Sequence, residues 1–356
     1  MDRVTEAHID LGALRENARL AGSLAPGSRL LAVVKANAYG HGAREVAHAL
    51  HGIADAFAVA RIDEARSLRR AGIAAPIVLL STLPDAAQLV ECARERLDIV
   101  VHEATTLRRI AAQPLPRPIG VWLKIDTGMH RLGIPPEAAP AAFATLSALP
   151  WVSQVTLMSH FASADDEHSA ATDAQLACFD ACTEGLDAPV SLANSAAILC
   201  RPDSHREWIR PGIMLYGANP LPDRQPLRPV MTLRSSLLAV REIEAGASVG
   251  YNGSWTSTRR ALIGTVAAGY GDGYPRHAPS GTPVLVNGQR VPLVGRVSMD
   301  MITVDLSDQP AAAAGDPVEL WGAALPVEEI ARCAGTIAYE LLTRVTERPR
   351  RIYRDR

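Results

Sequence analysis

Over its first two-thirds, the 356-residue chain alternates short runs of β-branched residues with longer stretches rich in Ala, Leu and Arg. The longer stretches, such as IDEARSLRRAG and AATDAQLACFDACTEGL, carry the apolar spacing of amphipathic helices. The short runs, in order, are LLAVV, FAVA, PIVLL, LDIVV, IGVWLKID, VTLMSH, VSLAN and IRPGIML. This rhythm is typical of parallel strands joined by crossover helices, because parallel neighbours need a long connection.

Eight such units in about 200 residues predict a (β/α)8 barrel of the TIM type, which is an α/β fold. A doubly wound open sheet is the alternative, but no Gly-x-Gly-x-x-Gly turn supports it. After the proline-rich stretch at 219–229 come MTLRSSLLAV, ALIGTVAAG, TPVLVNGQRVPLVG, MITVDL and DPVELWG, with a hairpin signal at Asn287-Gly288. We therefore predict a barrel domain at 1–230 and a C-terminal, mainly antiparallel β domain at 231–356.

Composition favours a small-molecule partner over a polyanion. The chain has 36 basic and 38 acidic residues, a formal net charge of -2, and no basic stretch of the kind that binds nucleic acid. The N-terminus lacks the features of a secretory signal, and no apolar run approaches membrane-spanning length. We therefore expect a cytoplasmic protein with no membrane or nucleic-acid partner.

The five cysteines indicate neither a disulfide framework nor a metal site. Their number is odd, and no two are spaced as Cys-x-x-Cys. Cys178 and Cys182 lie four residues apart on a predicted helix and could form a metal pair, but buried small apolar side chains are the simpler interpretation. No metal ion is expected.

Unusual polar residues recur where the predicted barrel strands end. They are Lys35 after the first strand, Lys124 and Asp126 at the fifth with Arg131 beyond, His160 at the sixth, Asn194 and Ser195 at the seventh, and Arg210 and Gly212 in the eighth unit. Each has a structural explanation by itself, such as a solvated strand end, a core histidine or a helix cap. Barrel enzymes build their sites at the carboxyl ends of the strands, so clustering at one rim favours a functional site.

These residue types suit a cofactor that carries an aldehyde and a phosphate. A lysine at the mouth of a barrel can form a Schiff base with pyridoxal 5'-phosphate. Small residues and helix N-termini near the later strands supply backbone N–H donors for the phosphate. Lys35 ends an apolar run, and Ser195 with the Gly212-Ile213 backbone suits the phosphate.

The chain resembles the alanine racemases, pyridoxal-phosphate enzymes of bacterial D-alanine supply. The similar segments span the whole chain: IDLGAL, AVVKANAYGHG, DTGMHRLG, MSHFASAD, NSA, RPGIMLYG, VGYN, GYGDGYPR, GRVSMD and RVTERPRRIYR. The resemblance implies an isomerase that interconverts L-alanine and D-alanine, either for peptidoglycan or in alanine catabolism. It also implies a homodimer with shared active sites.

The resemblance assigns roles to individual residues. Lys35 matches the Schiff-base lysine, and the other cofactor-binding positions are Tyr39, His160, Asn194, Ser195, Arg210, Gly212, Ile213 and Tyr353. Within that set, Tyr39, Ser195, Gly212, Ile213 and Tyr353 would bind the phosphate, while Arg210 would face the pyridine nitrogen. Arg131 and the Met299 backbone would hold the substrate carboxylate, and Lys124 matches a lysine that is carbamylated in some members. Ser298 stands where other members have cysteine.

Racemisation moves a proton off one face of the α-carbon and returns it to the other, so two opposed bases are the natural arrangement. Lys35 can serve one face, and the resemblance implies that Tyr251, from the β domain of the other subunit, serves the second. A phenol titrates near ~10 and needs assistance, which the resemblance places in a chain through His160 to Arg210. A permanently charged arginine also disfavours a proton on the pyridine nitrogen, which limits transamination and decarboxylation.

Three other interpretations compete with a racemase. A decarboxylase of the same barrel family would normally carry a Cys-Asp pair near the position of GRVSMD. A non-catalytic pyridoxal-phosphate carrier needs no β domain and no Tyr251, and a purely structural barrel would bind no cofactor. The β domain and Tyr251 argue against the non-catalytic carrier.

Overall fold

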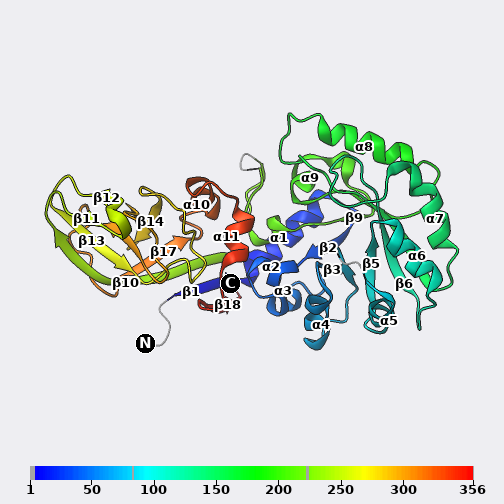
Figure 1. Ribbon diagram of the computed structural model, residues 1–356, viewed down its shortest axis with the longest axis horizontal. Helices are drawn as coiled ribbons and strands as arrows, with labels where there is room; N and C mark the ends of the chain where they lie inside the picture. Colours follow the sequence, from blue (N-terminus) through cyan, green and yellow to red (C-terminus); the bar gives the residue numbers. More distant parts are fainter. Residues whose placement is uncertain (1–4, 82–83, 222–223, 356) are drawn as a thin grey trace.

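The computed structural model describes residues 5–81, 84–221 and 224–355. Residues 1–4, at the start of the predicted barrel domain, and residues 222–223, in the proline-rich stretch, lie outside the described residues. Figure 1 shows two parts along the longest axis, a barrel wrapped by helices and an elongated sheet domain. Among the described helices, none combines the length and apolar character needed to cross a bilayer.

Eight parallel strands close into the barrel, which confirms the predicted fold and excludes an open sheet. They are β2 Arg29–Val33, β3 Ala56–Val59, β4 Ile77–Leu79, β5 Leu97–Val101, β6 Ile119–Lys124, β7 Val152–Met158, β8 Val190–Ser191 and β9 Trp208–Ile209. Pairing of β2 with β9 completes the ring. The near-continuous burial of these strands reflects packing on both faces, inside the barrel and under the helices.

The helices around the barrel follow the expected alternation. They are α1 Leu11–Leu24, α2 Lys35–Tyr39, α3 Ala43–Ala49, α4 Ile62–Arg70, α5 Ala86–Arg94, α6 Ala104–Ala112, α7 Ala139–Ser147, α8 Ala171–Cys182 and α9 Ser195–Cys200, with 3-10 turns at Pro136–Ala138 and Pro202–Ser204. On α8 the buried face is formed by Thr172, Gln175 and Phe179. Cys178 and Cys182 are partly exposed, so their interpretation as buried apolar side chains was wrong.

The eighth barrel strand is much shorter than the predicted run IRPGIML. It ends at Ile209, and a 3-10 helix, η3, occupies Ile213–Tyr216. Pro211 has no N–H for a strand ladder, and the Gly212 N–H donates instead to the Ser195 hydroxyl, at 2.9 Å. This early end of the strand brings the Gly212 backbone next to the start of α9.

The second domain is a mainly antiparallel sheet, as predicted. Its strands are β1 Glu6–Asp10, β10 Met231–Ile243, β13 Ala261–Val266, β14 Pro283–Val286, β15 Gln289–Pro292, β16 Ile302–Asp305, β17 Pro317–Trp321 and β18 Arg350–Arg354, beside a small ribbon of β11 Ser248–Val249 and β12 Trp255–Thr256. Asn287 and Gly288 join β14 to β15 with φ angles of 51° and 78°. These positive angles match the predicted hairpin turn.

The N-terminal strand β1 lies in this sheet and not in the barrel. It pairs antiparallel with β10 and parallel with β18. Its alternating pattern buries Ala7 and Ile9, and Asp10 then caps α1 by accepting the Ala13 N–H at 2.9 Å. The described chain therefore begins in the sheet, forms the barrel and returns to the sheet. The predicted division near residue 230 did not include this arrangement.

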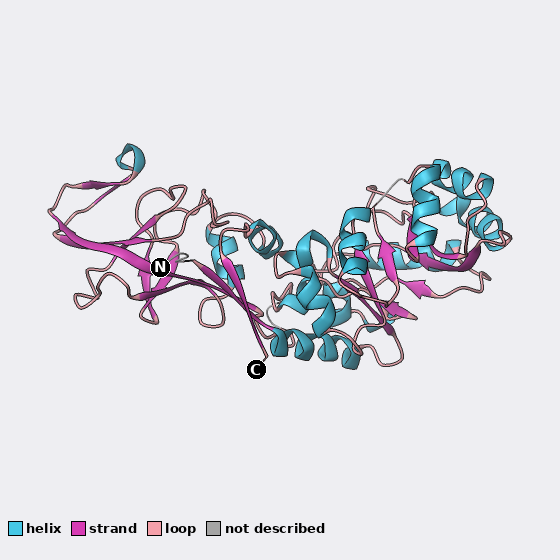
Figure 2. Cartoon of the chain, turned by 90° about the horizontal axis from the view of Figure 1, so that it is seen from below, coloured by secondary structure: helices cyan, strands magenta, loops and turns pink. Residues whose placement is uncertain are grey.

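Two short helices of the second domain, α10 Val327–Cys333 and α11 Ala338–Arg344, lie where the sheet meets the barrel. Figure 2 shows this junction from a second direction, with the helices between the sheet and the barrel. Both helices contribute residues to a cavity at the barrel mouth. The second domain thus helps to form the wall of that cavity.

Candidate active site

A cavity of about 940 Å³ opens at the carboxyl ends of the barrel strands. The predicted site residues that line it are Lys35, Tyr39, Lys124, Arg131, His160, Asn194, Ser195, Arg210, Gly212 and Ile213. Residues of α10 and α11, including Arg332 and Tyr339, form another part of its wall. The barrel thus brings together side chains that are up to 178 residues apart in the sequence, from Lys35 to Ile213.

Lys35 opens α2, a turn with unusual backbone geometry. The φ angles of Ala36, Asn37, Ala38 and Tyr39 are 51°, 54°, 52° and 51°, so four consecutive non-glycine residues are left-handed. Such a conformation costs about 1–2 kcal/mol for each residue with a Cβ. Backbone strain of this kind persists only where surrounding contacts determine it, and it gathers at functional sites.

Side chains brace the far end of this turn. His41 Nδ1 donates to the Tyr39 carbonyl at 2.9 Å, and Asn37 Oδ1 accepts the Ala43 N–H at 2.9 Å. Gly40 packs so closely on α11 that a Cβ there would collide with the Leu342 carbonyl. The turn is therefore held by its own residues and by the second domain.

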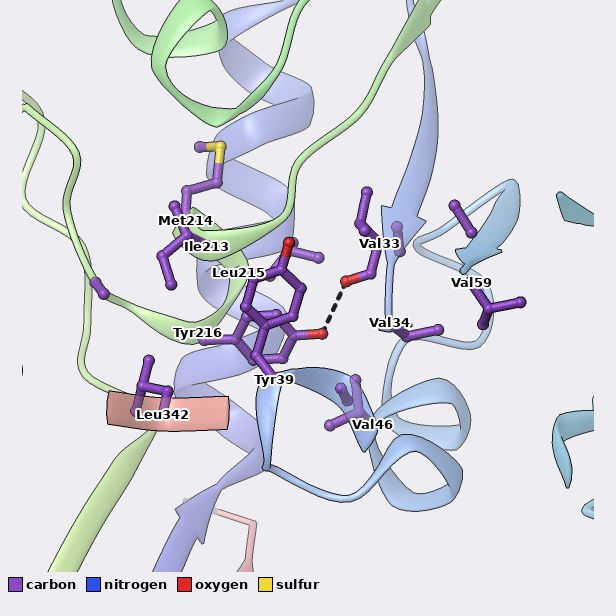
Figure 3. Close-up of a cluster of buried hydrophobic side chains, with 14 of the residues drawn as sticks. Val33, Val34, Tyr39, Val46, Val59, Ile213, Met214, Leu215, Tyr216 and Leu342 are labelled. Atoms are coloured by element: carbon purple, nitrogen blue, oxygen red, sulfur yellow. Dashed lines mark hydrogen bonds between the residues drawn. The ribbon is translucent and has the colours of Figure 1, made fainter. Parts of the chain in front are cut away.

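Tyr39 is buried at the cavity wall among aromatic rings. Its ring stacks on that of Tyr216 with the centroids 4.8 Å apart, and the Tyr216 hydroxyl donates to the Val33 carbonyl at 2.9 Å, as Figure 3 shows. Burial raises the pKa of Tyr39 above its usual value. Tyr39 therefore stays a neutral phenol, which can donate a hydrogen bond to an anion.

Ser195 and Gly212 form a small cradle beside Tyr39. The Ser195 hydroxyl oxygen accepts the N–H groups of Gly212 and Met214 at 2.9 and 3.3 Å, so its own hydrogen remains free to donate. A Cβ on Gly212 would lie only 2.8 Å from the Tyr39 hydroxyl. Asn194 caps α9 by accepting the Ala197 N–H at 3.0 Å. Glycine thus leaves room for a ligand where any side chain would fill the cradle.

Arg210 is buried and is held entirely by neutral acceptors in the described part of the chain. It donates to the Ser191 hydroxyl at 2.8 Å and to the Ser159 and Leu192 carbonyls at 2.6 and 3.0 Å. Burial lowers the pKa of Arg210 to about 10, which still leaves it protonated at neutral pH. Its positive charge is therefore fixed in place without a carboxylate to neutralise it.

His160 lies next to this guanidinium, with Nδ1 3.4 Å from Arg210. Burial and the Arg210 charge lower the pKa of His160 well below its usual value. The imidazole is therefore neutral and can accept a hydrogen bond from Arg210.

Four cations from the barrel, Lys35, Lys124, Arg131 and Arg210, line the cavity, whose wall also includes Arg332 and the acidic residues Asp165, Glu328 and Glu340. Burial and the charges of Arg210 and Arg131 lower the pKa of Lys124 to about 8. Burial and the Arg131 charge likewise lower the pKa of Lys35. The barrel side of the cavity, with this cluster of cations, favours an anionic group of a ligand.

Asp126, which was expected at the same rim, organises a loop. Its carboxylate accepts the N–H groups of Gly128 and His130 at 3.1 and 3.0 Å. It is not part of the cavity wall. Asp126 therefore shapes the segment that leads to Arg131.

Three predicted residues lie outside the cavity of their own chain. Tyr251 and Met299 belong to the sheet domain and are 63% and 53% exposed. Tyr353 packs against Gly42, and burial together with the Glu45 charge raises its pKa to about 12. The structure therefore does not place these side chains around Lys35 within one chain.

Tyr339 lines the cavity and was missed by the sequence analysis. Its ring centroid lies 6.0 Å from that of Tyr39. Burial raises the pKa of Tyr339 to about 12, so it is also a neutral phenol. The motif AYEL has the pattern of an ordinary helix, and nothing in its spacing connects it to the barrel rim.

A closed barrel with a lysine and several other cations at its mouth, bounded by a second domain, has the architecture of a barrel enzyme whose site lies at the carboxyl ends of the strands. Two family models match nearly the whole chain: alanine racemase, N-terminal domain, over residues 9–220, and alanine racemase, C-terminal domain, over residues 230–353. The chain belongs to the alanine racemase family, which confirms the resemblance seen in the sequence.

Individual relatives agree over the full length. The alanine racemase of Azoarcus sp. strain BH72 is 54% identical over 344 residues, covering 96% of this chain and 97% of the relative. The crystal structure of the biosynthetic alanine racemase from Pseudomonas aeruginosa has a TM-score of 0.96 at 50% identity and covers 99% of both chains. The alanine racemase from Bartonella henselae, whose structure has covalently bound pyridoxal phosphate, has a TM-score of 0.91 at 31% identity, again covering 99% of both chains.

Proposed function

We propose that this chain forms a cytoplasmic homodimer that interconverts L-alanine and D-alanine with pyridoxal 5'-phosphate as its resident cofactor. The observation that carries the proposal is the presence of the Lys35 amine and the cradle of Ser195 and Gly212 in one cavity. The absence of a side chain at Gly212 lets the Tyr39 hydroxyl lie beside the Ser195 hydroxyl, so two hydroxyl donors suit a phosphate group, and the covalently bound cofactor of the Bartonella henselae relative supports the choice. When bound, the cofactor withdraws electrons from the substrate and so acidifies its α-hydrogen.

The phosphate group would be held by neutral donors. Tyr39, Ser195 and the backbone of Gly212 and Ile213 are the ones predicted from sequence. Of these, the Gly212 N–H, which donates to the Ser195 hydroxyl, would exchange that acceptor for the phosphate. We propose Tyr339 as the further hydroxyl in place of Tyr353, because Tyr339 lines the cavity next to Tyr39 whereas Tyr353 packs against Gly42. Arg210 would face the pyridine nitrogen, with His160 beside it and Asn194 shaping the start of α9.

The proton transfers need one base on each face of the substrate. Lys35 would serve one face, while Arg131 and the Met299 backbone hold the substrate carboxylate. Tyr251 of the partner subunit would serve the opposite face. Tyr251, Tyr270, Met299 and Met301 of the sheet domain are 63%, 37%, 53% and 42% exposed, and exposed apolar side chains of this kind favour burial against a second subunit.

Lys124 fits the proposed carbamylation. Its pKa of about 8 leaves part of the amine neutral at neutral pH, and only the neutral amine can react with carbon dioxide. The product would exchange one cation of the cluster for an anion that can orient Arg131.

Chiral analysis of a panel of L-amino acids after incubation with the cofactor-loaded protein tests the proposed function. D-alanine should form fastest. Release of carbon dioxide and an amine would instead support a decarboxylase, and no turnover would support a non-catalytic cofactor carrier.

The relative from Pseudomonas aeruginosa is biosynthetic, so we propose D-alanine supply for peptidoglycan in preference to alanine catabolism. Growth of a D-alanine auxotroph that expresses this chain would check that role.

The substitution Gly212→Ala should weaken binding of pyridoxal phosphate by about 10- to 100-fold, because the new methyl group overpacks the cradle against the Tyr39 hydroxyl. Absorbance titration of cofactor-free protein measures the affinity. Gly22→Ala on α1 is the matched control, since a Cβ there meets open space. Equal affinities in the two variants would remove Gly212 from the phosphate site.

The substitution Arg210→Glu should slow racemisation by roughly 100-fold or more and increase pyruvate formation by transamination. A carboxylate beside the pyridine nitrogen would favour its protonation and so a stronger electron sink. Chiral chromatography and a pyruvate assay measure both rates. Arg70→Glu on the exposed face of α4 is the control for the charge change. Unchanged racemisation by the Arg210 variant would place Arg210 outside the site.

A further inference from the structure

Glu64, on the barrel helix α4, contacts the turn that carries Lys35. Its Oε1 atom accepts the N–H of Ala36, the residue directly after Lys35, at 2.6 Å. Its Oε2 atom accepts the N–H groups of Ala60 and Arg61 at 2.9 and 3.1 Å. One oxygen of Glu64 therefore binds the turn after Lys35, and the other binds the start of α4.

The bond from the Arg61 N–H to Oε2 is the one that a capping box makes at the start of α4. That task needs only one oxygen and does not involve Lys35. Oε1 instead spans 28 residues of sequence and makes the shortest of the three bonds. Ala36 is the first left-handed residue of the turn, so this bond holds the chain where the strained conformation begins.

The charge of Glu64 also acts on Lys35. The other groups that face Lys35 are Arg131, Lys124 and His160, the first two of which are cations and the third neutral. Glu64 acts in the opposite direction to these cations, since its charge raises the pKa of Lys35 while burial and Arg131 lower it.

We infer that Glu64 is a positioning residue for racemisation, whose carboxylate fixes the backbone next to Lys35 and so directs the amine into the cavity. This inference rests on the proposed role of Lys35. Glu64 does not line the cavity and acts through the backbone of the turn.

The test compares full-length Glu64→Gln and Glu64→Asp with the wild-type protein. A glutamine amide has one acceptor oxygen, so it cannot serve both Ala36 and the helix cap. Aspartate keeps the charge but is too short by one methylene to reach Ala36. Asp63→Asn removes a neighbouring charge that pairs with Arg61, and Gln88→Ala removes the equivalent capping bond, 3.0 Å long, from α5.

Two measurements other than activity are made. Absorbance titration gives the affinity for pyridoxal phosphate, and mass spectrometry of the Lys35 peptide after brief reductive methylation of cofactor-free protein gives the pH of half-modification. Both Glu64 variants should bind the cofactor about tenfold more weakly. Glu64→Gln should also lower the pH of half-modification by roughly 0.5 unit, whereas Glu64→Asp should leave it near the wild-type value. The Asp63 and Gln88 variants should match the wild type in both measurements.

Wild-type cofactor affinity in both Glu64 variants would overturn the inference. An equal loss of affinity in Gln88→Ala would also overturn it, because helix stability alone would then explain the effect. Borohydride reduction of the wild-type holoenzyme is the separate check on the proposed function: if the cofactor is fixed to a residue other than Lys35, the proposed function fails whatever the Glu64 variants show.

Discussion

Replacing Lys35 with alanine should lower racemase activity by about 10⁴-fold or more, because one residue both holds the cofactor and moves the proton on one face of the substrate. Borohydride reduction of the wild-type holoenzyme, followed by peptide mapping, should place the cofactor on the Lys35 peptide. Chiral chromatography measures the loss of activity in the variant.

Lys124 provides the control for this experiment. It is the other lysine of the cavity and is buried, and its pKa of about 8 also makes it reactive. The variant Lys124→Ala should still acquire the label on Lys35. A label on Lys124 in the wild-type enzyme would overturn the assignment of the site.

Mixing the variants Lys35→Ala and Tyr251→Phe should restore activity that neither has alone. If each active site combines the barrel of one subunit with the sheet domain of the other, a heterodimer has one site with both bases intact and one site with neither. Complete random exchange should then yield roughly a quarter of the wild-type activity, since half of the dimers are mixed and each has one of two sites intact. Racemase assays before and after subunit exchange measure the recovery.

A matched mixture tests whether the geometry of the shared site is responsible. Lys35→Ala and Arg210→Glu both alter the barrel, so a heterodimer of these two has no intact site and should stay inactive. Lack of recovery with Tyr251→Phe, despite exchange demonstrated by mass spectrometry of the dimers, would show that each site is built within one chain. The 63% exposure of Tyr251 would then need another explanation.

The barrel and the position of its site could be predicted because both depend on local patterns. Strand and helix periods follow from which faces are buried, and eight such units in about 200 residues favour a closed barrel. The carboxyl ends of parallel strands meet at one rim, so Lys35, Lys124 and Arg210 could be grouped before any coordinates were known. The hairpin at Asn287-Gly288 was equally local, since those residue types tolerate positive φ angles.

The placement of distant segments could not be predicted in the same way. The alternation in EAHID predicts a strand but does not name its partners, and β1 joins β10 and β18 from the far end of the chain. Tyr339 reaches the cavity because α11 packs on the turn after Lys35. Tyr353, to which the family resemblance assigned the phosphate, packs against Gly42 instead. These contacts depend on how two domains meet, and that information is absent from local periodicity.

The turn at Lys35 shows the physical reason for this division. The residues alone predict a lysine at the end of the first barrel strand, and the family motif around it indicates its chemistry. Ala36, Asn37, Ala38 and Tyr39 have no local preference for four left-handed conformations in succession, and each L-residue resists them. The conformation of the turn depends on tertiary contacts, because the stabilising contacts come from Glu64 on α4 and from α11 of the second domain.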